Sequence, residues 1–286
     1  MKLKSPPPLE IFSLFTIVLT AISFCVVQVM QGRSAAGVVF SHTPKPYVYR
    51  VLTPTVARIL VWILHITPET AFTLVVVFSA VGMFYAMRTL SPVMVAFLAT
   101  EFVLFLMAYQ GKIYDMATGA GFALALGLLQ HKQFSAYYVL FAIMVINRET
   151  TILLIPLFIL YLWIKSQYRY YFIFGTLYQI IAYVVITALI RWYFADVPGE
   201  AITFQPVNNM QIYFIHPIAT LALLAGLAGI LYLVLRDWQS KPVFLQAAFL
   251  CIFSPLVVMH ILIGYAFEMR VFIEAVPVTA LLMIKV

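Results

Sequence analysis

The chain has 286 residues, of which 64% are hydrophobic and only 9% are charged, and its mean hydropathy is +1.04. A soluble domain is close to half apolar, with about a quarter of its residues charged, so this composition excludes an ordinary soluble domain and predicts an integral membrane protein. The formal net charge is +7. The basic residues are spread singly, so we expect them to orient the chain and to meet lipid head groups, and we expect no nucleic acid partner.

The apolar runs are continuous over about 15–22 residues, whereas the strands of a transmembrane barrel would alternate over about ten. They predict an all-α, polytopic bundle in one membrane domain, 1–286. The apolar segments are 11–30, 51–66, 70–88, 92–109, 114–130, 134–147, 150–164, 171–191, 217–235, 242–263 and 267–285. We expect about ten spans, within a range of about nine to eleven, and two longer outer loops at 31–50 and 192–216.

The first apolar segment follows Lys2 and Lys4, a charge arrangement that signal peptides share. Its apolar run is about 20 residues, longer than a signal-peptide core, and no small-residue cleavage site ends it. We therefore expect an uncleaved first span with a cytoplasmic N-terminus. The two cysteines, Cys25 and Cys251, lie in apolar segments, and no histidine pair has ligand spacing, so neither a disulfide nor a metal site is expected.

The segment 51–66 is short and carries Thr53, Pro54 and Arg58. A helix lying at the membrane boundary fits it as well as a crossing does. If it does not cross, ten spans bring both termini to the cytoplasmic side.

Four small polar clusters interrupt the apolar sequence, and the parity of the crossings places all four on one face of the membrane. They lie at 49–54, 114–115, 147–150 and 268–270. An ionised side chain in the hydrocarbon slab is costly, and it usually faces a cavity, a partner or a substrate. The clusters therefore predict one polar site that opens to one face.

The cluster at 147–150 follows an apolar run of only 14 residues, 134–147, which is short for a hydrocarbon core of about 30 Å. We expect this break to lie below the membrane surface. Arg148 could bind a phosphate bidentately, and Glu149 could orient it or act as a base; alternatively, the two residues only hold two helices together.

The other clusters leave similar alternatives open. Asp115 opens a span and could be a simple N-terminal cap. Glu268 and Arg270 are two residues apart, so they would not share a helix face, and Arg270 is either a second anion ligand or an interfacial anchor. Arg50 could meet an anionic head group, although Arg and Tyr are common at membrane boundaries.

The residues 114–156 begin an apolar helix with Tyr-Asp-Met-Ala-Thr, end a second one in Asn-Arg-Glu-Thr, and continue with Leu-Leu-Ile-Pro. Together with Tyr49-Arg-x-Leu-x-Pro54 and Glu268-x-Arg270, this sequence resembles bacterial polytopic proteins related to the GT-C glycosyltransferases. The resemblance covers most of the chain through short motifs. It implies a protein of the cytoplasmic (inner) membrane that takes a sugar from a polyprenyl-phosphate carrier at the outer face, with inversion at the sugar.

The resemblance also implies roles. Arg148, Arg270 and Arg50 would hold the lipid phosphate and stabilise the charge that develops on it, and Asp115 or Glu149 would accept the proton of the acceptor hydroxyl. The supporting residues would be Tyr49, Tyr114, Asn147 and Glu268. No cofactor is predicted, use of a divalent metal is left open, and the partners would be membrane lipid and the polyprenyl-phosphate-linked sugar.

The chain departs from that pattern in its first outer loop, where GT-C enzymes usually carry a catalytic acidic residue. Residues 31–50 contain no Asp or Glu. Either Asp115 replaces that residue, or the chain is a non-catalytic subunit or lipid-binding scaffold of a larger membrane complex. A transporter or flippase would show an internal repeat with interrupted helices in matching positions, and the sequence shows none that is convincing.

Overall fold

The computed structural model describes residues 8–30, 45, 47–110, 113–164, 169–199 and 204–284. Within them it contains 12 α-helices and no strand, which confirms the all-helical bundle. The α-helices are α1 (Pro8–Met30), α3 (Leu52–Leu64), α4 (Pro68–Arg88), α5 (Val93–Gln110), α6 (Ile113–Gln130), α7 (Phe134–Asn147), α8 (Leu154–Ile164), α9 (Arg169–Tyr193), α10 (Pro206–Ile215), α11 (Pro217–Leu235), α12 (Val243–Ile263) and α13 (Val276–Ile284). Short 3₁₀ helices are η1 (Tyr47–Tyr49), η2 (Glu149–Leu153), η3 (Trp238–Ser240) and η4 (Met269–Ala275).

Within the described part of the chain, five helices are long and apolar enough to cross a membrane, namely α1, α4, α9, α11 and α12. Four apolar stretches are shorter, at Leu52–Leu64, Val93–Met107, Phe134–Asn147 and Glu149–Ile164. These lengths are compatible with a multi-pass membrane protein. Three of the four shorter stretches have one end near Asn147 in the structure. Leu52–Leu64 and Glu149–Ile164 begin there, and Phe134–Asn147 ends there. We call the end of the bundle that contains Asn147 the polar end.

The helix α3 does not run the length of the bundle. It begins at the polar end, where the hydroxyl of Thr53 donates to Oδ1 of Asn147. Three residues separate α3 from the start of α4. The helix α4 finishes at the opposite end, since a methyl group added at Gly127, late in α6, would lie 3.3 Å from Oγ1 of Thr89. Because α4 spans the bundle away from the polar end, α3 must stay at that end. The boundary-helix interpretation of 51–66 therefore fits the structure.

The predicted outer loop 192–216 is wrong in part, because α10 occupies its second half. Pro206 stands in the first turn of α10 and presets a helical backbone angle. The two predicted long loops meet at residue Lys45, whose amide donates to the carbonyl of Pro198 at 3.1 Å and whose Nζ donates to the carbonyl of Ala195 at 2.8 Å. The remainder of those loops, at 31–44, 46 and 200–203, lies outside the described residues.

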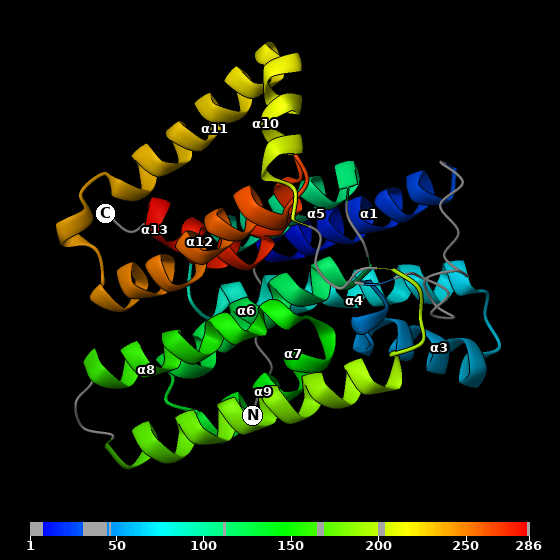
Figure 1. Ribbon diagram of the computed structural model, residues 1–286, viewed down its shortest axis with the longest axis horizontal. Helices are drawn as coiled ribbons and strands as arrows, with labels where there is room; N and C mark the ends of the chain where they lie inside the picture. The colour runs from blue at the N-terminus through cyan, green and yellow to red at the C-terminus, as the bar shows by residue number, and fades with distance from the viewer. Residues whose placement is uncertain are drawn as a thin grey trace.

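The helices α10 and α11 form a V-shaped pair at the top of Figure 1, and α11 leans away from α12 and α13. In the described part of the chain, α8 and α13 have only 11 and 9 residues, and the helices long enough to cross a membrane number five. The number of about ten spans stays a prediction.

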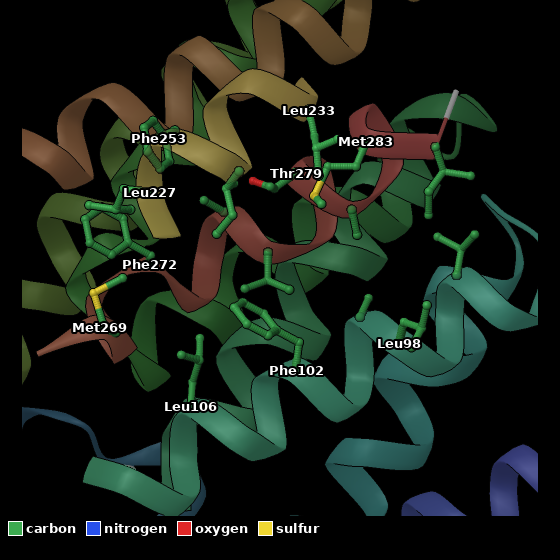
Figure 2. A pocket seen from close by; sticks show the side chains of 17 residues that line it. Leu98, Phe102, Leu106, Leu227, Leu233, Phe253, Met269, Phe272, Thr279 and Met283 are labelled. Carbon is green, nitrogen blue, oxygen red and sulfur yellow. The ribbon is translucent and has the colours of Figure 1, made fainter. Parts of the chain in front are cut away.

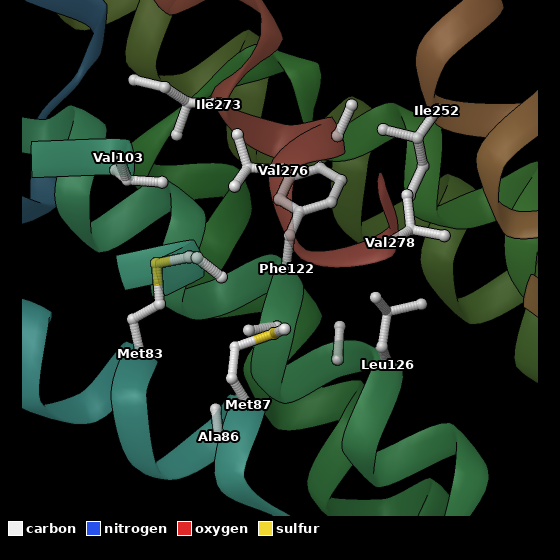
Figure 3. Close-up of a cluster of buried hydrophobic side chains, with 14 of the residues drawn as sticks. Met83, Ala86, Met87, Val103, Phe122, Leu126, Ile252, Ile273, Val276 and Val278 are labelled. Atoms are coloured by element: carbon white, nitrogen blue, oxygen red, sulfur yellow. The ribbon is translucent and has the colours of Figure 1, made fainter. Parts of the chain in front are cut away.

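One part of the core lies where α4, α5, α6, α12, η4 and α13 meet (Figure 3). Met83, Phe122 and Ile273 are all fully buried there. A methyl group added at Gly119 would lie 3.2 Å from the side chain of Ile273 and 3.3 Å from the sulfur of Met83. The glycine thus lets α6 approach both α4 and η4 closely, as small residues do in membrane bundles, and it brings the first turn of α6 next to η4.

Candidate ionic site at the polar end

Asp115 stands at the centre of a buried ionic cluster. Its Oδ1 lies 3.1 Å from Nη1 of Arg148, and its Oδ2 lies 3.3 Å from Nη1 of Arg270. On its other side, Arg148 places Nε 3.1 Å from Oε1 of Glu274. Three separate parts of the chain, α6, the break after α7, and η4, therefore meet through charged side chains. The prediction that the scarce charged residues converge at one end of the bundle fits this geometry.

Arg148 reaches Asp115 because the chain leaves helical geometry at this residue. Its backbone is extended, with φ of −162° and ψ of 138°, between the end of α7 and the start of η2. The next residues continue as a 3₁₀ helix before α8 begins. The short apolar run 134–147 predicted such a break, and the break directs the guanidinium toward α6 and not along the α7–α8 axis.

Glu268 and Arg270 pair directly, with Nε of Arg270 donating to Oε1 of Glu268 at 2.6 Å. The expectation that they would face different ways is wrong because it assumed an α-helical backbone. Phe267 has a positive φ of 63°, and the 3₁₀ helix η4 begins only at Met269. The second oxygen of Glu268 accepts from the amide of Tyr265 at 3.2 Å, so the turn before η4 fixes the carboxylate.

Asn147 links three helices beside the cluster. Its Nδ2 donates to Oγ1 of Thr118 at 3.0 Å and to the carbonyl of Tyr114 at 3.3 Å, while its Oδ1 accepts from Thr53. Asn147 is fully buried, and a buried amide is stable only when its polar atoms are bonded. It therefore holds the starts of α3 and α6 against the end of α7.

The cluster is closed to its surroundings. The side chains of Asp115 and Glu274 are 0% exposed, and those of Arg148 and Arg270 are 5% and 6% exposed. Two guanidinium groups face three carboxylates, since Glu268 belongs to the same group. Charges buried in this way must compensate one another, and removing one partner leaves an uncompensated charge. We call this cluster of Asp115, Arg148, Arg270, Glu268 and Glu274 the ionic base of the polar end.

A second, outer group of residues lies beside this base, and we call it the outer tier: Tyr49, Arg50, Tyr114, Glu149 and Arg191. Cζ of Arg50 lies 4.4 Å from the centre of the Tyr114 ring, and Cζ of Arg191 lies 6.0 Å from the centre of the Tyr49 ring. Such positions favour cation–π attraction. The carbonyl of Glu149 accepts from the hydroxyl of Tyr183 at 3.1 Å.

The three charged residues of the outer tier are more open than the ionic cluster, whereas Tyr49 and Tyr114 are buried. Arg50 and Glu149 are half-buried, and Arg191 is exposed. Burial lowers the pKa of the Arg50 guanidinium, but Tyr114, Glu149 and Asp115 together raise it by more, so its pKa lies above the ordinary value. Arg50 is therefore a permanent cation. The hydroxyl of Tyr114 is buried and has no hydrogen-bond partner among the residues that the structure describes.

All nine residues singled out in the sequence lie at the polar end, but they divide into the two groups. Asp115, Arg148, Arg270 and Glu268 belong to the buried base, and Asn147 lies beside it. Tyr49, Arg50, Tyr114 and Glu149 belong to the outer tier.

Sequence reasoning gave no role to Glu274, Arg191 or Thr150, although Thr150 belongs to the predicted cluster 147–150. Oε1 of Glu274 accepts from the hydroxyl of Thr150 at 2.6 Å, and Glu274 also faces Arg148. Glu274 stands four residues after Arg270, within an apolar run, and that isolated position was the available signal. Arg191 ends the apolar segment 171–191, and only its position beside Tyr49 brings it into the outer tier.

Over the described residues, no group of three or more His, Cys, Asp or Glu side chains is placed to hold a metal ion. The carboxylates of the base accept from guanidinium groups, from the hydroxyl of Thr150 and from the amide of Tyr265.

Comparison with protein-family models, with curated proteins and with solved structures finds no match. The fold and the site by themselves define the class of protein, an all-helical multi-pass membrane protein with a buried ionic base and a more open cationic tier at one end.

Proposed function

We propose that this chain is a membrane glycosyltransferase-type protein that takes a sugar from a polyprenyl-phosphate carrier at the face of the membrane where the polar end lies. The observation that carries the proposal is the convergence of Arg50, Arg148, Arg270, Asp115 and Glu149 at one end of an apolar bundle. Ionisable groups inside a membrane protein are functional by default. The resemblance to GT-C enzymes supplies the reaction.

The two groups of residues take different roles in this proposal. Asp115 engages two guanidinium groups through both of its oxygens, and its side chain is fully buried, so neither oxygen is open to an acceptor hydroxyl. It is therefore a positioning residue. Glu149 is half-buried and lies near Arg50, so it is the better general base, and Arg50 is the cation best placed to meet a phosphate.

The proposed transfer is a single displacement. Glu149 accepts the proton of the acceptor hydroxyl, the hydroxyl oxygen forms the bond to the anomeric carbon, and the bond from that carbon to the phosphate oxygen breaks. The electron pair leaves with the lipid phosphate. Arg50 stabilises the charge on the departing phosphate, which is the kind of contribution that fixed cations make to transfer reactions.

The test is transfer of a radiolabelled sugar by the purified protein in liposomes, with a panel of polyprenyl-phosphate-linked hexoses and pentoses. Glu149→Gln should lower the rate by about 10²–10⁴-fold, and Arg50→Gln by about 10²–10³-fold. Arg236→Gln, in an exposed pair with Asp237 between α11 and α12, is the matched control and should transfer at the wild-type rate. Absence of transfer by the wild type with every donor would overturn the proposal.

A non-catalytic subunit or lipid-binding scaffold is the second candidate, and the closure of the ionic base favours it. A cluster in which the arginines are already occupied by carboxylates can serve solely to fix the helices. This candidate predicts a partner protein that copurifies in stoichiometric amount, together with no turnover of any lipid-linked sugar.

A further inference from the structure

An apolar cavity of about 450 Å³ lies between α5, α11 and the continuous segment of η4 and α13 (Figure 2). Its volume falls within the range of about 300–1,000 Å³ that is usual for ligand pockets. Thr279 is the one lining residue with a polar side chain. The cavity is separate from the ionic base, which contains none of its lining residues.

The walls of the cavity continue to the outer surface of the bundle. Leu98 and Phe102 of α5 are 53% and 42% exposed, and Leu233 of α11 is 38% exposed. In a multi-pass membrane protein, an apolar surface between helices of this kind faces hydrocarbon and not water. The medium that has access to the cavity is therefore lipid.

The dimensions of the cavity match one lipid leaflet. Along α5 the lining residues run from Val95 to Leu106, which corresponds to about 16 Å at the helical rise of about 1.5 Å per residue. Half of a hydrocarbon core of about 30 Å is about 15 Å. One acyl chain of a phospholipid therefore fits the cavity in length.

The segment η4 connects this cavity to the ionic base. In a 3₁₀ helix the residues at i and i+3 lie in line, and Met269, Phe272 and Ala275 all line the cavity. Arg270 and Glu274 stand between them in the sequence and make the ion pairs with Asp115 and Arg148. One short segment thus has the cavity on one side and the ionic base on the other.

We infer that the cavity binds a single acyl chain of a membrane phospholipid, and that the bound chain fixes η4 and thereby the positions of Arg270 and Glu274. An unfilled void deprives its lining atoms of contact partners. In an unfilled cavity, Met269 and Phe272 would have packing contacts on only one side. A bound chain supplies the missing contacts, and it does so whether or not the protein transfers sugar.

The test uses the purified full chain in detergent and palmitoyl lysophosphatidylglycerol, a single-chain lipid, as the probe. Native mass spectrometry counts the bound lipid. Ala280→Phe places a ring in the cavity from α13 and should weaken binding at least tenfold. Ala222→Phe, at an exposed position of α11 that does not line the cavity, makes the same change and should bind as the wild type does.

Hydrogen–deuterium exchange then measures the coupling. The lipid should slow exchange of the amides in 268–276 at least threefold in the wild type and in Ala222→Phe, with no such effect in Ala280→Phe. Undecaprenyl phosphate is tested in parallel. Preferential protection of 268–276 by that lipid would overturn the assignment of a phospholipid chain.

Two further results would overturn the inference: full binding by Ala280→Phe, or binding that leaves exchange in 268–276 unchanged. If Ala280→Phe does not fold, Leu233→Trp narrows the cavity from α11 and takes its place. Failure of sugar transfer bears on the proposed function alone, because neither readout depends on turnover.

Discussion

Asp115 and Arg270 are 155 positions apart in the sequence, yet Nη1 of Arg270 lies 3.3 Å from Oδ2 of Asp115. The contact joins the first turn of α6 to η4. Arg148 pairs with the other oxygen of the same carboxylate, so one aspartate holds three chain segments together. Its removal should therefore destabilise the whole polar end.

Asp115→Asn should destabilise the protein by about 3–5 kcal/mol, since it leaves two buried guanidinium groups without their shared carboxylate. Unfolding by a denaturing detergent in mixed micelles measures the change. Asp237→Asn is the control, because its ion pair with Arg236 has side chains 48% and 60% exposed and is worth at most about 1 kcal/mol. Equal effects of the two substitutions would contradict the description of a buried base.

Asn209→Ala should destabilise the protein by about 2–3 kcal/mol. The Asn209 amide donates to the carbonyl of Gly264 at 2.6 Å and accepts from the amide of Ala266 at 2.9 Å, so the substitution leaves buried backbone groups unsatisfied. Asn208→Ala changes the same residue type one position earlier, where the side chain is exposed, and should stay within about 0.5 kcal/mol. The same unfolding assay compares the two variants. A larger loss of stability for Asn208→Ala than for Asn209→Ala would exclude the proposed role of Asn209 in holding α10 against the turn at 264–266.

Gly264→Ala should destabilise the protein by about 1–3 kcal/mol, the usual cost of overpacking. Its new methyl group would lie 2.8 Å from the carbonyl oxygen and 2.9 Å from Cα of His260, which are backbone atoms that cannot rotate away. Gly226→Ala in α11 meets nothing within 4 Å and should be neutral or stabilising by up to about 1 kcal/mol. Thermal unfolding followed by circular dichroism distinguishes them, and no difference between the two variants would show that the turn adjusts freely.

Tyr114→Phe should leave stability unchanged or raise it by about 1 kcal/mol, because the buried Tyr114 hydroxyl has no partner within the described part of the chain. Tyr137→Phe is the matched comparison, since the Tyr137 hydroxyl donates to the carbonyl of Leu154 at 3.0 Å, and it should lose about 1 kcal/mol. If Tyr114→Phe keeps its stability and loses sugar transfer or phosphate binding, the hydroxyl serves a ligand. A loss of stability as large as that of Tyr137→Phe would assign it a structural bond instead.

Some features of the site were accessible from local sequence. The apolar run 134–147 is too short to cross by itself, and this predicted the break at Arg148. The pairing of Glu268 with Arg270 was not predicted, because the i, i+2 argument presumes a helix and the backbone at Phe267 has a positive φ. Glu274 was overlooked because its partners, Arg148 and Thr150, lie more than 120 positions away and leave no local pattern.

The sequence by itself determined the helical membrane-protein class, and it predicted that the polar clusters lie at one end of the bundle. The composition shows that the helices are stable in lipid. Predicting that the polar clusters share one end of the bundle requires only the order of the crossings along the chain. The tertiary structure alone decided which charge meets which, that α3 and α10 stay at the polar end, and that η4 separates a cavity from the ionic base. The physical reason is that these helices are apolar on every side, so no polar face in the sequence specifies which neighbour each helix packs against; that choice depends on close packing at positions such as Gly119 and on ion pairs that exist only after the bundle has formed.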